Sequence, residues 1–107
     1  MVSPVAAGTA FVAVSELSVP PEGRAALEDA FAHRLGAVEA WPGFQGLEVW
    51  SDSADPTKYV MVSWWDSHSD FRAYMASEDH ACSHARIPSG PDRARPRSFR
   101  RYQVVAR

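Results

Sequence analysis

The chain of 107 residues is short enough to form one domain over residues 1–107, and 46% apolar and 22% charged residues are ordinary globular proportions. These values exclude a disordered chain, and no apolar stretch is long enough to span a membrane. The single Cys82 excludes an internal disulfide framework, and residues 1–9 lack the basic start and long apolar run of a secretory signal. We therefore expect a cytoplasmic protein without a membrane partner.

The net charge of −2 conceals a strong asymmetry along the chain. Residues 1–85 carry four basic and twelve acidic side chains, whereas residues 86–107 carry seven arginines and one aspartate. The arginines either neutralise the acidic body or bind a carboxylate-bearing ligand, which needs only a few of them. Nucleic-acid binding requires a wider basic surface with interleaved aromatic residues, so a nucleic-acid partner is not expected.

The first half of the chain predicts a strand, a helix and a second strand. Residues 10–19 are rich in β-branched and apolar side chains, which favours a strand. Residues 20–23 begin a helix because proline suits the first helical turn, and apolar residues recur at helical spacing to about residue 40. Trp41-Pro42-Gly43 ends that helix, and residues 44–51 form a strand with Leu47 and Val49 on one face and Glu48 and Trp50 on the other.

The second half predicts a strand, two short helices and a last strand. Residues 52–56 form a polar turn, and residues 59–65 form a third strand that is apolar on both faces. Residues 66–70 supply capping side chains for a short helix that runs through Phe71, Tyr74 and Met75. A further helix is expected over residues 78–86, followed by a loop over residues 88–96 and a strand over residues 98–106.

The order βαββαβ predicts an α+β, ferredoxin-like domain, which is an antiparallel sheet with helices on one face. Helices on one side leave the second apolar face of residues 59–65 without a cover. The simplest cover is the sheet of a second copy, so we expect a symmetric homodimer in the form of a dimeric α/β barrel.

Histidines are the main candidates for metal chemistry, since the chain has no Cys-x-x-Cys, glycine-rich phosphate loop or nucleophile elbow. His80 and His84 share a helix face, but no third or fourth zinc ligand can be placed. His84, just before the arginine-rich segment, either lies on the surface or ligates an iron atom. We interpret His33 and His68 as surface residues.

Twelve aromatic side chains are many for so small a domain. They indicate either a core and dimer interface or a pocket between helices and sheet that accepts a flat aromatic ligand. Tyr74, ten residues before His84, is a candidate to line that pocket. Ser15, the small polar residue in the middle of the first strand, either bonds to a neighbouring strand or donates a hydrogen bond into the pocket.

Three segments resemble the antibiotic biosynthesis monooxygenase superfamily, whose members form dimers of ferredoxin-like domains. Phe31-Ala32-His33-Arg34 with Pro42-Gly43-Phe44 is similar to the end of its first helix, and Tyr59 through Ser67 to its third strand. Phe71-Arg72-Ala73-Tyr74 with Ser83-His84-Ala85-Arg86 is similar to the helical segment that ends in a ligand histidine. Over roughly residues 10–105, the chain is most similar to the IsdG-type heme-degrading monooxygenases.

That resemblance implies that heme is both substrate and cofactor, opened with O2 and an external reductant supplied by an electron donor. His84 takes the position of the histidine that ligates the iron. Ser15 falls on the position of a distal asparagine and Tyr74 on that of a tryptophan under the porphyrin, so two of three positions depart from the pattern. The candidate walls and propionate partners are Phe31, Trp65, Arg86 and one or more of Arg93, Arg95 and Arg97.

Two other functions fit the same residues. A cofactor-free monooxygenase would oxidise a phenolic polyketide, with Ser15 and Tyr74 orienting the substrate and His84 a general base or incidental. A dimeric binding module would carry heme or a small aromatic ligand without turnover, as the two departures suggest.

Overall fold

The computed structural model describes residues 10–33, 37–85 and 90–106, with only the backbone for residue 37 and residues 82–85. Four strands, three α-helices and two short 3-10 turns follow one another within these ranges. Their order is β1 (Phe11–Ser18), η1 (Pro21–Gly23), α1 (Arg24–Ala32), η2 (Ala37–Ala40), β2 (Phe44–Ser51), β3 (Lys58–Trp65), α2 (His68–Met75), α3 (Glu78–Ala85) and β4 (Arg95–Gln103). None of the described helices is long and apolar enough to cross a membrane.

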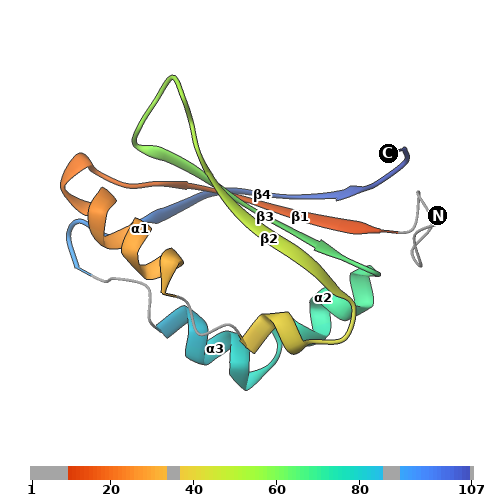
Figure 1. Cartoon of the computed structure of the whole chain (residues 1–107). Helices are drawn as coiled ribbons and strands as arrows, with labels where there is room; N and C mark the ends of the chain where they lie inside the picture. Colours follow the sequence, from red (N-terminus) through yellow and green to blue (C-terminus); the bar gives the residue numbers. More distant parts are fainter. Residues whose placement is uncertain (1–9, 34–36, 86–89, 107) are drawn as a thin grey trace.

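The strands form one antiparallel sheet in the order β2-β3-β1-β4, and α1, α2 and α3 all lie on the same side of it (Figure 1). This arrangement confirms the predicted α+β, ferredoxin-like fold. The register places Phe11 opposite Trp65 and Gln103, and Ser15 opposite Met61 and Phe99. Because residues that face each other across antiparallel strands point to the same side, the register identifies which side chains face the helices.

Two buried clusters fill the space between helices and sheet at opposite ends of the strands. The first cluster, which we call the α2 cluster, contains Phe11, Ala13, Val38, Trp65, Phe71 and Tyr74. The second, the α1 cluster, contains Val19, Leu27 and Tyr59, with Leu17, Phe31, Val49 and Ala94 packed against it. The buried core therefore consists of two parts, one at each end of the strands.

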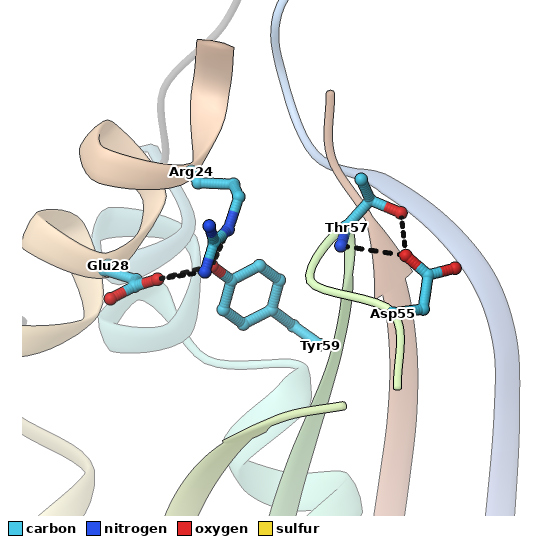
Figure 2. A network of polar contacts seen from close by, with 5 residues as sticks. All are labelled: Arg24, Glu28, Asp55, Thr57 and Tyr59. Atoms are coloured by element: carbon cyan, nitrogen blue, oxygen red, sulfur yellow. Dashed lines mark hydrogen bonds and ion pairs between the residues drawn. The ribbon is translucent and has the colours of Figure 1, made fainter. Parts of the chain in front are cut away.

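The α1 helix is joined to β3 through the hydroxyl of Tyr59 (Figure 2). This hydroxyl donates a hydrogen bond to the carboxylate of Glu28 and accepts one from Nε of Arg24 at 3.1 Å. Arg24 and Glu28 lie one turn apart on α1, with 3.7 Å between Nη2 and Oε2. The buried phenol thus fixes α1 over the sheet.

The α2 helix begins where the sequence predicts, at a capping serine. Oγ of Ser67 accepts a hydrogen bond from the backbone N–H of Asp70 at 3.1 Å, and its hydroxyl donates to the Asp70 carboxylate at 2.9 Å. Gly43 lies against that carboxylate with φ of 81°, and a Cβ there would be 2.3 Å from Oδ2 of Asp70. Only glycine therefore suits the turn before β2.

The predicted single helix over residues 20–40 is wrong. The α1 helix ends at Ala32, and the non-helical residue His33 follows it, with φ of −111° and ψ of 29°. Residues 37–40 form the separate turn η2. The physical reason is the divided core: Leu27 of α1 is buried in the α1 cluster, whereas Val38 of η2 is buried in the α2 cluster.

The predicted last strand is also displaced, because β4 covers Arg95–Gln103 and not residues 98–106. Its first residues pair with the end of β1, so that Arg95 lies opposite Ser18 and Pro96 opposite Leu17. Every residue of β4 is exposed, which allows arginine at positions where a buried strand would need apolar side chains. The residue range of β4 therefore depends more on pairing with β1 than on the hydropathy of its side chains.

The face of the sheet that points away from the helices is apolar in its middle, as predicted from β3. Val62 is buried there, and Val60 and Trp64 are half-buried. Two large aromatic side chains border them and remain about half exposed, namely Trp50 at 48% and Tyr102 at 50%. We call this surface the open face.

Candidate functional site

A row of four side chains crosses the helix-facing side of the sheet between the two buried clusters. Val49 pairs with Met61, Met61 with Ser15, and Ser15 with Phe99, so the four belong to one cross-strand row. Val49, Met61 and Ser15 are only half-buried, and Phe99 is 50% exposed. We call these four residues the central row.

Partial exposure of the central row is unexpected for its position. Ser15 and Met61 lie in the middle of the two central strands, on the side that carries all the described helices. The rows on either side of it belong to the buried clusters, because Ala13 is in the α2 cluster and Tyr59 is in the α1 cluster. The helices therefore cover both ends of this side and leave its middle accessible, with an apolar floor and one hydroxyl.

Tyr74 and Trp65, two of the predicted site residues, are packed together in the α2 cluster. Their rings stack with centroids 5.5 Å apart and an interplanar angle of 30°. Trp65 is 1% exposed and its indole N–H donates to Oγ of Ser63 at 3.0 Å, which fixes the ring. Tyr74 is 8% exposed, so it belongs to the packed interior of the α2 cluster and not to a mobile surface.

Phe31 lies at the other end, half-buried against the α1 cluster. The structure therefore separates Phe31 from Trp65 and Tyr74, which belong to the α2 cluster. Ser15 lies between the two groups along the strand direction.

The helix that carries His84 is held by contacts from its first turn. The indole Nε1 of Trp41 donates to Oδ2 of Asp79 at 3.1 Å, and the ring of His80 meets that of Tyr74 edge-on at 5.3 Å. Oγ of Ser77 accepts from the backbone N–H of His80 at 3.1 Å. These contacts attach α3 to η2 and α2.

His84 lies in the last turn of α3, and its side chain, like the whole of Arg86, is outside the described residues. The described part of the chain brings no group of three or more His, Cys, Asp or Glu side chains together as a metal site. His33 is a surface residue as predicted, with Nδ1 bonded to the backbone oxygen of Asp29 at 3.0 Å.

His68 is a surface residue, as predicted. Its ring is exposed, but it packs 4.7 Å from the ring of Phe11 and lines a cavity of about 390 Å³. Sequence reasoning missed this cavity because its lining residues come from three separate elements, β1, α2 and β4. The sequence features that belong to this cavity are an aromatic residue at the start of the first strand and arginine near the end of the last strand.

A protein-family model matches the greater part of this chain. The family model described as antibiotic biosynthesis monooxygenase matches residues 10–86. This range extends from the residue before β1 to the residue after α3 and so includes Ser15, Tyr74 and His84.

Among curated proteins, this chain is 35% identical over 63 residues to the mycobilin-producing heme oxygenase of Mycobacterium tuberculosis. It is 38% identical over 45 residues to the staphylobilin-producing heme oxygenase of Staphylococcus saprophyticus. The first match spans 59% of this chain and 60% of the relative, and the second spans 40% and 43%.

Among solved structures, the heme-degrader MhuD from Mycobacterium tuberculosis, with two hemes bound in its active site, is 30% identical with a TM-score of 0.74. That match covers 91% of this chain and 97% of MhuD. SnoaB, a cofactor-independent oxygenase from Streptomyces nogalater, has the same TM-score of 0.74 at 17% identity, covering 90% and 93%. The second likeness establishes the fold alone.

Proposed function

The chain belongs to the antibiotic biosynthesis monooxygenase family, and we propose that it is a heme-degrading monooxygenase, which binds heme and opens its porphyrin ring with O2 and an external reductant. The observation that carries this proposal is the accessible central row between two buried clusters, on the side of the sheet where α3 carries His84. The likeness to MhuD, over nearly the full length of both chains, favours heme as the ligand.

The chemistry of the described side chains supports heme as the ligand. Val49 and Met61 provide an apolar floor, and Ser15 adds one hydroxyl in the middle of it. At one end of this surface Trp65 and Tyr74 stack in the buried α2 cluster, and at the other end Phe31 packs against the α1 cluster. A flat apolar ring with a polar edge is the kind of ligand that such a surface accepts.

Each residue then has a defined task. The imidazole of His84 would ligate the iron, and the hydroxyl of Ser15 would donate a hydrogen bond toward the bound ligand. Tyr74, Trp65 and Phe31 would orient the ring and exclude water, and Arg86 would face the propionates. When bound, heme supplies a redox-active iron and the porphyrin that is itself oxidised.

The proposal includes a homodimer formed through the open face. Trp50 and Tyr102 are about half exposed there, around the valines of β1 and β3. Large apolar patches of this kind mark interaction surfaces. A second copy of the same sheet would cover the patch by two-fold symmetry and leave the central row free on the other side.

A heme titration followed by absorbance tests the proposal, with His84→Ala beside His33→Ala as the matched control. We expect a saturable Soret band that His84→Ala loses and His33→Ala retains, because the His33 side chain is 69% exposed at the end of α1. Ascorbate and O2 are then expected to bleach the band and produce a bilin-like spectrum.

The alternative outcomes are distinct. A Soret band that persists through many equivalents of ascorbate would indicate a binding module without turnover. A parent protein that gives no Soret shift would contradict heme binding altogether. Phenolic substrates would then be assayed for oxygen uptake with Ser15→Ala and Tyr74→Phe.

A further inference from the structure

A cavity lies away from the central row, where the last residues of β4 and the first residue of α2 come together. Phe11, His68, Arg101, Tyr102 and Gln103 line it, and we call it the β4–α2 groove. Its volume of about 390 Å³ is at the lower end of the range for small-molecule sites. None of the central-row residues lines the groove, and Phe11 lies four residues from Ser15 on β1, which is about 13 Å in a strand.

The floor of the groove is aromatic. The ring of Phe11 is 8% exposed, and the imidazole of His68 packs on it at 4.7 Å with an angle of 32°. Phe71 supports both rings from beneath, 5.2 Å from Phe11 and 6.4 Å from His68. A flat ring placed on this floor would find stacked partners that are already fixed.

The rim of the groove is cationic. Arg101 lies opposite Ala13, so its side chain starts on the helix-facing side of the sheet, above the floor. Among the described residues Arg101 makes no ion pair, and it is exposed. An arginine guanidinium binds a carboxylate through two parallel hydrogen bonds, which makes a planar anion its natural partner.

From this combination we propose that the β4–α2 groove binds a small arene carboxylate. The aromatic ring of the ligand would lie on Phe11 and His68, and its carboxylate would pair with Arg101. The register places Arg101 and Gln103 on the side away from the open face, whereas Tyr102 borders that face. A dimer formed through the open face would therefore reach Tyr102 and leave Phe11, His68 and Arg101 accessible. The proposal does not depend on heme, because the central row takes no part in it.

The test is a titration of the 15N-labelled protein with benzoate, followed by the backbone amide shifts in NMR spectra. We expect saturable shifts at Phe11, His68 and Gln103 and smaller ones at Ser15 and Met61. Arg101→Gln is expected to weaken binding by about tenfold, which is the loss of one charge-assisted contact. Lys58→Gln, which removes the same charge at the opposite end of β3, is expected to leave the affinity within about twofold.

Acetate and benzamide test the charge contact and the ring contact separately. Acetate lacks the ring and benzamide lacks the charge, so each is expected to bind at least about tenfold more weakly than benzoate. His68→Ala is expected to weaken benzoate and leave acetate unchanged. Equal losses in Arg101→Gln and Lys58→Gln, or shifts centred on Ser15 and Met61, would overturn the proposal.

Discussion

At the scale of single residues, Tyr59 shows how one hydroxyl can attach a helix to a sheet. The phenol is 2% exposed, and its two hydrogen-bond partners both come from α1. Burial, followed by the hydrogen bond to Glu28, raises the pKa of Tyr59 above its ordinary value of 10.0. The folded state therefore favours the neutral phenol.

We expect Tyr59→Phe to lower the free energy of unfolding by about 1–2 kcal/mol, the value of one or two hydrogen bonds. The pH dependence has a definite sign. Because folding raises the pKa, the stability that the neutral phenol provides is complete below pH 10 and is lost as the pH rises through the folded-state pKa. Urea unfolding from pH 8 to 11 should show a steeper loss in the parent protein than in Tyr59→Phe, and parallel curves would contradict this account.

At the scale of elements, α3 is the part whose position matters most for the proposed function. Its described contacts lie in the first turn, where Trp41 bonds to Asp79 and Tyr74 meets His80, whereas His84 is in the last turn. The position of α3 relative to the central row therefore depends on how firmly that first turn is held. Trp41 also meets Tyr74 edge-on at 5.7 Å, so the same aromatic group supports both α2 and α3.

Asp79→Ala is expected to weaken heme binding about three- to tenfold, because the indole of Trp41 loses its acceptor and α3 loses a tether. Asp79→Asn should restore most of the affinity, since an amide oxygen also accepts a hydrogen bond. Glu78→Ala is the matched control, because it removes a neighbouring acidic side chain from the same helical turn. Heme titration with amide exchange of α3 measures both effects, and equal losses in Asp79→Ala and Glu78→Ala would argue against the tether.

At the scale of the whole molecule, the two faces of the sheet have different tasks. One face carries the helices and the accessible central row, and the other is the open face with its half-exposed aromatic residues. β4 closes one edge of the sheet with exposed arginines, which discourage further strand pairing at that edge. The proposed face-to-face association of two sheets would cover the half-exposed aromatic residues of the open face.

Trp50→Arg is expected to convert the proposed dimer to a monomer, because it replaces a large apolar contact of the interface with a charge. Met75→Arg is the matched control, since Met75 is a 42% exposed apolar side chain on α2, on the helix side. Sedimentation equilibrium should give a dimer for the parent protein and Met75→Arg and a monomer for Trp50→Arg. A monomeric parent protein, or equal dissociation of both variants, would refute the assignment of the open face.

Much of the fold and part of the candidate site follow from the sequence. Period-two alternation places Leu47 and Val49 on one face of β2 and Glu48 and Trp50 on the other, and Ser67 marks the start of α2. Both features can be predicted because they depend only on residues that are close together in the chain. The sequence also makes Ser15 a candidate site residue, because it is a polar residue inside an apolar strand. It makes Tyr74 a candidate because short segments resemble those of a known family. The roles of these two residues stay predictions.

The tertiary structure decided what depends on contacts between distant segments. The core consists of two clusters, and the predicted single helix is interrupted between Leu27 and Val38 because these residues belong to different clusters. The position of β4 is set by the residues that pair with β1. The tertiary structure also exposed the central row and brought Phe11, His68 and Arg101 into one groove. Periodicity carries no information about such groupings, because they arise from the register of strands and the packing of helices far apart in the chain.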